Sequence, residues 1–120
     1  MTVKTLTAAD FEATITDNAI VLIDFWASWC GPCRAFAPVF DRSAQSHPDV
    51  VHAKVDTEAQ QQLAAALEIQ AIPTIMAFRD GILVYRQPGA MPAAALEDLI
   101  TRVKELDMAD VRAQIAGKTH

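Results

Sequence analysis

Three stretches of the chain are apolar enough to be buried strands, namely residues 20–26, 50–56 and 74–78. Continuous apolar runs of this length are typical of strands that are covered on both faces of a sheet. A fourth run, residues 82–85, follows the third across an Asp-Gly pair at 80–81. This pair between two apolar runs predicts an antiparallel hairpin.

Helices are predicted between and after these strands, where apolar residues recur every three or four positions. The first begins after Thr7, which can form a capping box with Asp10. The second starts at Pro32, and it ends before Pro48 because a residue that precedes proline disfavours helical backbone. The predicted helices span about residues 7–18, 32–46, 57–67 and 92–106.

The third helix is expected to begin at Asp56 or Thr57 and to bury one apolar stripe, made of Ala59, Leu63, Ala66 and Leu67. A short edge strand is expected within residues 2–6. The order of elements predicts an α/β fold with a mixed central sheet of about five strands and helices on both faces.

A further helix is expected at the C-terminal end of the chain. Asp107 can cap it, and its apolar residues Met108, Val111 and Ile115 share one side. We expect residues 1–106 to form one domain and residues 107–120 to be a helical extension of that domain. The alternative is that this helix serves as a surface for a partner.

Composition excludes several classes of protein. The chain has 120 residues, of which 52% are hydrophobic, and this suits one domain that folds without structural disulfides. A net charge of −5 argues against nucleic-acid binding. The sequence contains no apolar run of membrane-spanning length, and its first seven residues lack a signal-peptide core. We therefore expect a cytoplasmic monomer that is not associated with a membrane.

Both cysteines of the chain, Cys30 and Cys33, lie between the first long strand and the second helix. At a helix N-terminus, unpaired N–H groups and the helix dipole favour the thiolate form of the first cysteine. The second cysteine, one turn further, can attack a mixed disulfide formed at the first. The pattern predicts a dithiol–disulfide exchanger in which Cys30 is ionised and accessible while Cys33 is covered.

Asp24 interrupts an otherwise apolar strand. Its side chain could point to an exposed face of the sheet, but helices are expected on both faces, and this favours burial. Burial raises the pKa of a carboxyl group, so Asp24 would suit the role of proton acceptor near neutral pH.

These residues resemble the thioredoxin family over about residues 3–105. The matching residues are Asp24-Phe25-Trp26-Ala27, Trp29-Cys30-Gly31-Pro32-Cys33, Pro38, Lys54, Asp56, Ile72-Pro73-Thr74, Asp80-Gly81 and Gly89. The resemblance implies the thioredoxin fold and a protein-disulfide reductase, a dithiol carrier in electron transport and cell redox homeostasis. It also implies a redox-active disulfide with no bound cofactor or metal.

The resemblance implies roles for the residues near the cysteine pair. Cys30 would be the attacking thiolate and Cys33 the resolving thiol, whose proton Asp24 would help to remove. Lys54 matches the lysine beside this aspartate, although it could equally be an ordinary solvated lysine. The implied substrate-binding residues are Trp29, Gly31, Pro32, Ile72, Pro73 and Gly89.

Ile72 and Pro73 match the family's cis-proline loop, which faces the cysteine pair. The free backbone of Ile72 would then pair with an extended segment of the substrate. Of the two tryptophans, Trp26 is expected to point inward and Trp29 to lie on the docking surface.

The dipeptide between the cysteines, Gly31-Pro32, accompanies reductants in the family. The resemblance therefore implies partners of two kinds, target proteins that carry disulfides and a thioredoxin reductase that draws electrons from NADPH. Ser28 replaces an acidic residue common in the family, and Pro88 precedes Gly89. Both departures lie near the docking surface and concern the choice of partner.

Two other readings deserve a test. The spacing of Cys30, Cys33, His47 and His52 fits a zinc-finger template, but Pro48 would break the helix that must carry both histidines. Alternatively, the chain could be a binding module of the same fold in which the cysteines are incidental. A biological role that survives replacement of Cys30 by serine would favour that module.

Overall fold

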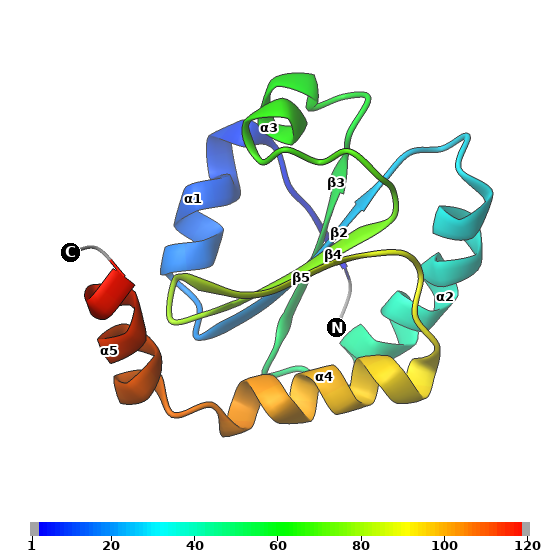
Figure 1. Cartoon of the computed structure of the whole chain (residues 1–120). Helices are drawn as coiled ribbons and strands as arrows, with labels where there is room; N and C mark the ends of the chain where they lie inside the picture. The colour runs from blue at the N-terminus through cyan, green and yellow to red at the C-terminus, as the bar shows by residue number, and fades with distance from the viewer. Residues whose placement is uncertain (1–2, 119–120) are drawn as a thin grey trace.

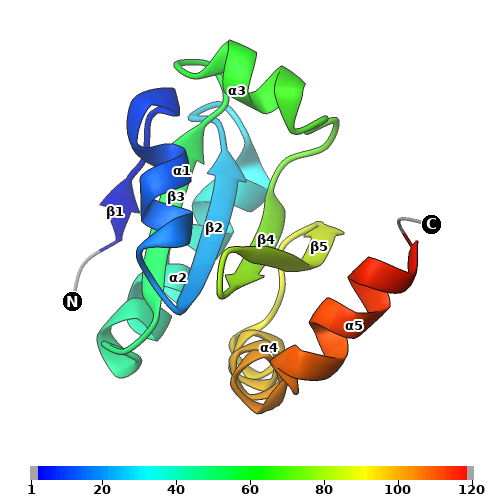
Figure 2. The ribbon, with the colours of Figure 1, turned by 90° about the vertical axis from the view of Figure 1, so that its left-hand side faces the viewer.

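Within residues 3–118, the part of the chain that the computed structural model describes, five strands form one mixed sheet in the order β1-β3-β2-β4-β5 (Figures 1 and 2). The first three strands in this order are parallel, whereas β4 is antiparallel to β2, and β5 is antiparallel to β4. The strands are β1 (Lys4–Thr5), β2 (Ile20–Trp26), β3 (Val51–Asp56), β4 (Thr74–Arg79) and β5 (Ile82–Pro88). The expected five-stranded mixed sheet is confirmed.

Helices cover both faces of the sheet, as expected (Figure 1). On one face, α2 (Gly31–Ser46) and α4 (Ala93–Glu105) enclose a core cluster that contains Phe36, Phe40, Leu96 and Ile100. On the other face, α1 (Ala8–Thr16) and α3 (Gln61–Ala66) cover a second cluster, which includes Ile15, Met76 and, at its border, Leu63. No helix within residues 3–118 is long and apolar enough to cross a membrane.

The central strand β2 contributes side chains alternately to the two faces. Ile20 and Leu22 belong to the cluster under α2 and α4, whereas Val21, Ile23 and Phe25 belong to the opposite one. Successive side chains of a strand point to opposite faces, so Asp24 lies on the same face as Leu22. The strand thereby directs its one carboxyl group toward the helix that carries the cysteines.

The third helix differs from its prediction. It starts at Gln61 rather than beside Asp56, because the Asp56 carboxylate accepts the backbone N–H of Ala59 at 3.3 Å and forms a turn before the helix. Ala59 and Ala66, which were expected in the apolar stripe, are exposed, whereas Ala64 is buried. The two leucines of the expected stripe are partly buried.

The additional C-terminal helix is present as α5 (Met108–Lys118), and it lies beyond β5 at the side of the sheet (Figure 2). Met108 is buried and Val111 is partly buried, but Ile115 is 43% exposed. Arg112 of α5 pairs with Asp80 in the β4–β5 turn at 3.3 Å. Residues 1, 2, 119 and 120 of the expected domain and its extension lie outside the described residues.

Candidate active site

The two cysteines lie at the N-terminus of α2. Cys30 is the N-cap residue, and its Sγ lies 2.28 Å from Sγ of Cys33, at disulfide distance. The backbone N–H of Cys33 donates to Cys30 Sγ at 3.2 Å. Because this N–H is one of those that a helix leaves unpaired, it favours negative charge on Cys30 when the pair is reduced.

The expected difference in exposure between the two cysteines does not appear in the disulfide form. Cys30 is 4% exposed and Cys33 is 3% exposed. The cover over the first sulfur comes partly from a distant loop, since the carbonyl oxygen of Ile72 lies 3.7 Å from Cys30 Sγ. The two sulfurs differ in their surroundings instead, with Cys30 beneath this loop and Cys33 beside a small cavity.

The loop that faces the sulfurs contains the expected cis bond between Ile72 and Pro73. The backbone N–H of Gly89 donates to the Pro73 carbonyl at 2.7 Å and ties the end of β5 to this loop. Gly89 has a φ of +102°, a backbone conformation that side chains larger than hydrogen rarely adopt. The hydroxyl of Thr74 also donates to the carbonyl of Ala71 across the loop.

Asp24 is 4% exposed, and no described residue hydrogen-bonds its Oδ1 atom. Burial raises the pKa of Asp24 from 3.8 to about 7; the Lys54 charge opposes this rise, and Asp41 adds to it. The carboxyl group lines a cavity of about 110 Å³ together with Trp26, Cys33, Arg34, Ala37 and Lys54. The site thus holds a carboxyl group that titrates near neutral pH beside the second cysteine.

Lys54 lies opposite Asp24 in the parallel pairing of β2 and β3, so both side chains extend from the same face. It is partly buried, and its Nζ lies 5.4 Å from the centre of the Trp26 ring. This lysine therefore borders the cavity and contributes positive charge to it.

The residues that were expected to bind substrate carry no charge. Trp29 is 66% exposed, as expected, and Gly31, Pro32 and Gly89 are also exposed. Ile72 is partly buried. Trp26 is partly buried too, and its indole Nε1 is buried with no partner among the described residues. Exposed backbone and apolar side chains of this kind offer contact to another protein.

Sequence reasoning did not assign a role to Arg34, the residue after Cys33. Its Nη1 donates to the carbonyl of Ser28 at 2.8 Å, and its side chain lines the same cavity as Asp24. Its place in the first turn of the helix, directly after the second cysteine, was the available signal. The carbonyl that holds it could not be identified from spacing.

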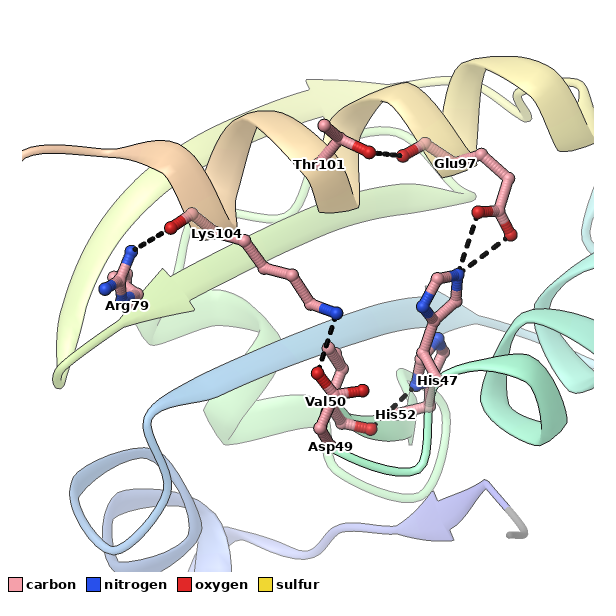
Figure 3. Close-up of polar contacts among 8 residues, drawn as sticks. All are labelled: His47, Asp49, Val50, His52, Arg79, Glu97, Thr101 and Lys104. Atoms are coloured by element: carbon pink, nitrogen blue, oxygen red, sulfur yellow. Dashed lines mark hydrogen bonds and ion pairs between the residues drawn. The ribbon is translucent and has the colours of Figure 1, made fainter.

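The two histidines of the zinc-finger reading, His47 and His52, have polar partners of their own (Figure 3). His47 ends α2 and its Nε2 lies 2.8 Å from a Glu97 carboxylate oxygen of α4. His52 is buried in β3, where its Nδ1 donates to the Val50 carbonyl at 3.0 Å and its Nε2 accepts from the Ser43 hydroxyl at 2.8 Å. Burial lowers the pKa of His52.

The cysteines lie at the opposite end of the 16-residue helix α2 from the first of these histidines. In residues 3–118, no group of three or more His, Cys, Asp or Glu side chains could hold a metal ion. The zinc-finger reading therefore has no support in this geometry.

A hollow of about 770 Å³ lies between β5 and α4. It is lined by Val84, Tyr85, Leu99 and Leu106, among others, and it contains neither cysteine. The sulfurs lie instead under an open surface, which suits a protein substrate better than a small molecule that needs enclosure.

Known proteins that are similar to this chain are thioredoxins. A family model described as thioredoxin matches residues 2–102. A protein named putative thioredoxin 2 from Streptomyces coelicolor is 53% identical over 111 residues, which cover 92% of this chain and 83% of that protein. Thioredoxin 1 from Synechococcus elongatus is 41% identical over 99 residues, which cover 81% of this chain and 92% of that protein.

Solved structures agree in fold. A mutant thioredoxin from Halobacterium salinarum superposes with a TM-score of 0.82 at 35% identity and covers 88% of this chain and 93% of its own. Mitochondrial thioredoxin 3 from Saccharomyces cerevisiae, in its oxidized form, gives a TM-score of 0.75 at 34% identity. The match covers 87% of this chain and 95% of that protein. The chain belongs to the thioredoxin family of thiol–disulfide oxidoreductases, and its cysteine pair is the redox-active disulfide.

Proposed function

We propose that Cys30 is the attacking thiolate and Cys33 the resolving thiol in the reduction of protein disulfides. The observation that carries this assignment is the backbone N–H of Cys33, which points at Cys30 Sγ from the first turn of α2. Cys33 Sγ has a different neighbour, the cavity that contains Asp24. The order of attack follows from this difference in electrostatics.

The reaction transfers two electrons to the target. The Cys30 thiolate attacks one sulfur of the target disulfide, forms a mixed disulfide and releases the other target sulfur as a thiolate, which is then protonated. The Cys33 thiolate then attacks Cys30 Sγ, forms the intramolecular disulfide and releases the second target thiol. The protein is oxidised in these two steps and the target is reduced.

Asp24 is the proposed acceptor of the proton that Cys33 must lose. Its pKa of about 7 allows it to accept a proton from a neighbouring thiol and to release it near neutral pH. The cavity between them, about 110 Å³, has room for water that can relay the proton. Lys54 assists as a positioning residue, because its charge opposes the rise in the pKa of Asp24.

Targets are proposed to dock on the apolar surface around the first sulfur. Trp29, Gly31, Pro32 and Gly89 offer exposed contact area. The backbone next to the cis bond, at Ile72, would hydrogen-bond an extended segment of the target in the manner of an added strand. Pro73 fixes the shape of this loop but has no N–H to donate.

The cellular setting is part of the same proposal. A net reductant works where thiols are kept reduced, which supports a cytoplasmic role in electron transport and redox homeostasis. The oxidised pair would be recycled by a thioredoxin reductase that draws on NADPH, and the chain would act as a monomer. Residues 107–120 are proposed to extend the same domain, supported by the buried Met108 and by the pair of Arg112 with Asp80.

The test is reduction of insulin disulfides by the reduced protein, with Cys30→Ser as the critical variant. We expect the wild type to reduce insulin and the variant to be inactive, with unfolding curves showing that both are folded. Activity in Cys30→Ser would contradict the proposal, whereas a biological role that Cys30→Ser retains without reducing insulin would favour the binding module. Equilibration against glutathione buffers then tests whether the protein is a reductant or an oxidant of disulfides. The proposal requires the protein dithiol to be more reducing than the glutathione couple.

A further inference from the structure

Arg34 places a fixed positive charge beside the redox-active pair. It lies in the first turn of α2, directly after Cys33, and its side chain is exposed. The guanidinium is held by one hydrogen bond, from Nη1 to the Ser28 carbonyl in the loop that leads to the cysteines. A guanidinium has five N–H donors, so the others remain available to a carboxylate on a docked protein.

The other residues of the proposed docking surface carry no charge. Trp29, Gly31, Pro32 and Gly89 are uncharged. Asp24 is buried and cannot reach the surface. The nearby acid at the end of β3, Asp56, is partly buried and accepts two backbone N–H groups of its own loop, at 2.9 and 3.3 Å.

The hydrogen bond to the Ser28 carbonyl restricts the orientation of the Arg34 guanidinium. Arginine side chains in solution lose considerable freedom when they form a pair, and this loss makes exposed pairs weak. The hydrogen bond to Ser28 already restricts Arg34, so less freedom remains to be lost when a carboxylate arrives. A planar guanidinium can also bind both oxygens of one carboxylate.

We propose that Arg34 selects target disulfides that have an aspartate or glutamate within two or three residues of the attacked cysteine. This inference rests on the proposed function, because it concerns which disulfides the Cys30 thiolate attacks first. Acidic segments are attracted by the guanidinium and basic segments are repelled. For an exposed charge, the combined effect is about a three- to tenfold preference in rate at low salt.

The experiment uses two cyclic disulfide peptides that are identical except for a glutamate or a lysine two residues before the attacked cysteine. The reduced full-length protein is mixed with each peptide at pH 7 and low ionic strength, and the second-order rate constants are measured. The ratio of the two constants is the readout. Any effect of Arg34 on the reactivity of the thiolate cancels in this ratio, because the same thiolate attacks both peptides.

The matched control is Arg42, which is also exposed on α2 and also donates to a backbone carbonyl, that of Pro38 at 3.3 Å. It lies two turns further along the helix. Arg34→Gln and Arg42→Gln change the net charge equally, so they separate a local contact from the overall charge of the protein.

We expect the glutamate-to-lysine ratio to exceed about three in the wild type and in Arg42→Gln, to approach one in Arg34→Gln, and to invert in Arg34→Glu. Added salt at about 0.5 M should lower the wild-type ratio toward one. An unchanged ratio in Arg34→Gln, or an equal fall in Arg42→Gln, overturns the inference while leaving the proposed function intact. Failure to reduce either peptide would instead count against the proposed function.

Discussion

Replacing Asp24 by asparagine should stabilise the oxidised protein at alkaline pH. The carboxyl group is 4% exposed, and none of the described residues hydrogen-bonds its Oδ1 atom. Lys54, its neighbour across the strand pair, only partly offsets the burial. A buried carboxylate without adequate partners destabilises the folded state, and the amide of asparagine removes the charge while keeping the shape.

The magnitude follows from the pKa of Asp24, which burial raises from 3.8 to about 7. Between these values the folded protein holds a proton that the unfolded chain has released, so stability falls as pH rises through this window. Below pH 3.8 both states are protonated, and above pH 7 the full penalty is present. At roughly 1.4 kcal/mol per pKa unit, the penalty above pH 7 is about 4 kcal/mol.

The assay is urea unfolding at several pH values from 4 to 9. The oxidised protein is used because disulfide-bonded cysteines do not titrate. Asp24→Asn should match the wild type near pH 4 and exceed it by about 4 kcal/mol at pH 8. Glu12→Gln removes a charge from an exposed position of α1 and serves as the control, with an expected change below about 0.5 kcal/mol. A stability difference that is the same at every pH would refute the reasoning.

Three further predictions follow from the same geometry. Cys33→Ser should accumulate mixed disulfides with target proteins, seen as a mass increase that dithiothreitol removes; rapid turnover without such a species would contradict the two-step scheme. Lys54→Gln should raise the pKa of Asp24 above about 7, because the Lys54 charge lowers it, and carboxyl NMR titration of the oxidised protein would show an unchanged value if the two groups do not interact. Ile100→Ala should lower the free energy of unfolding by about 2 to 5 kcal/mol, since the side chain is 1% exposed between α4 and the sheet; a loss below about 1 kcal/mol in urea unfolding would show that this core region is loosely packed.

The strands and the redox motif could be predicted from the sequence because their signals are local. The apolar run of β2 and the Asp-Gly turn after β4 each determine structure within a few residues. Asp24 could be assigned to a buried face because the neighbouring helices were predicted on both sides of the sheet. For the strands and the turn, the residues that decide the outcome lie next to one another in the chain.

The features that were missed depend on contacts between distant segments. The near-equal cover of the two cysteines comes partly from Ile72, which is 42 residues from Cys30 along the chain. The late start of α3 depends on the orientation of one carboxylate, that of Asp56, toward its own loop. The cavity beside Cys33 is assembled from β2, α2 and β3, so spacing alone could not indicate its lining.

The most direct test of the account measures the reactivity of the two thiols separately. The fully reduced protein is treated briefly with iodoacetamide at pH values from 5 to 9, and peptide mass spectrometry quantifies the label on each cysteine. The account predicts that Cys30 is labelled first, at a lower pH than Cys33, because the helix N-terminus favours its thiolate. Equal labelling of both cysteines at every pH, or labelling of neither, would contradict it.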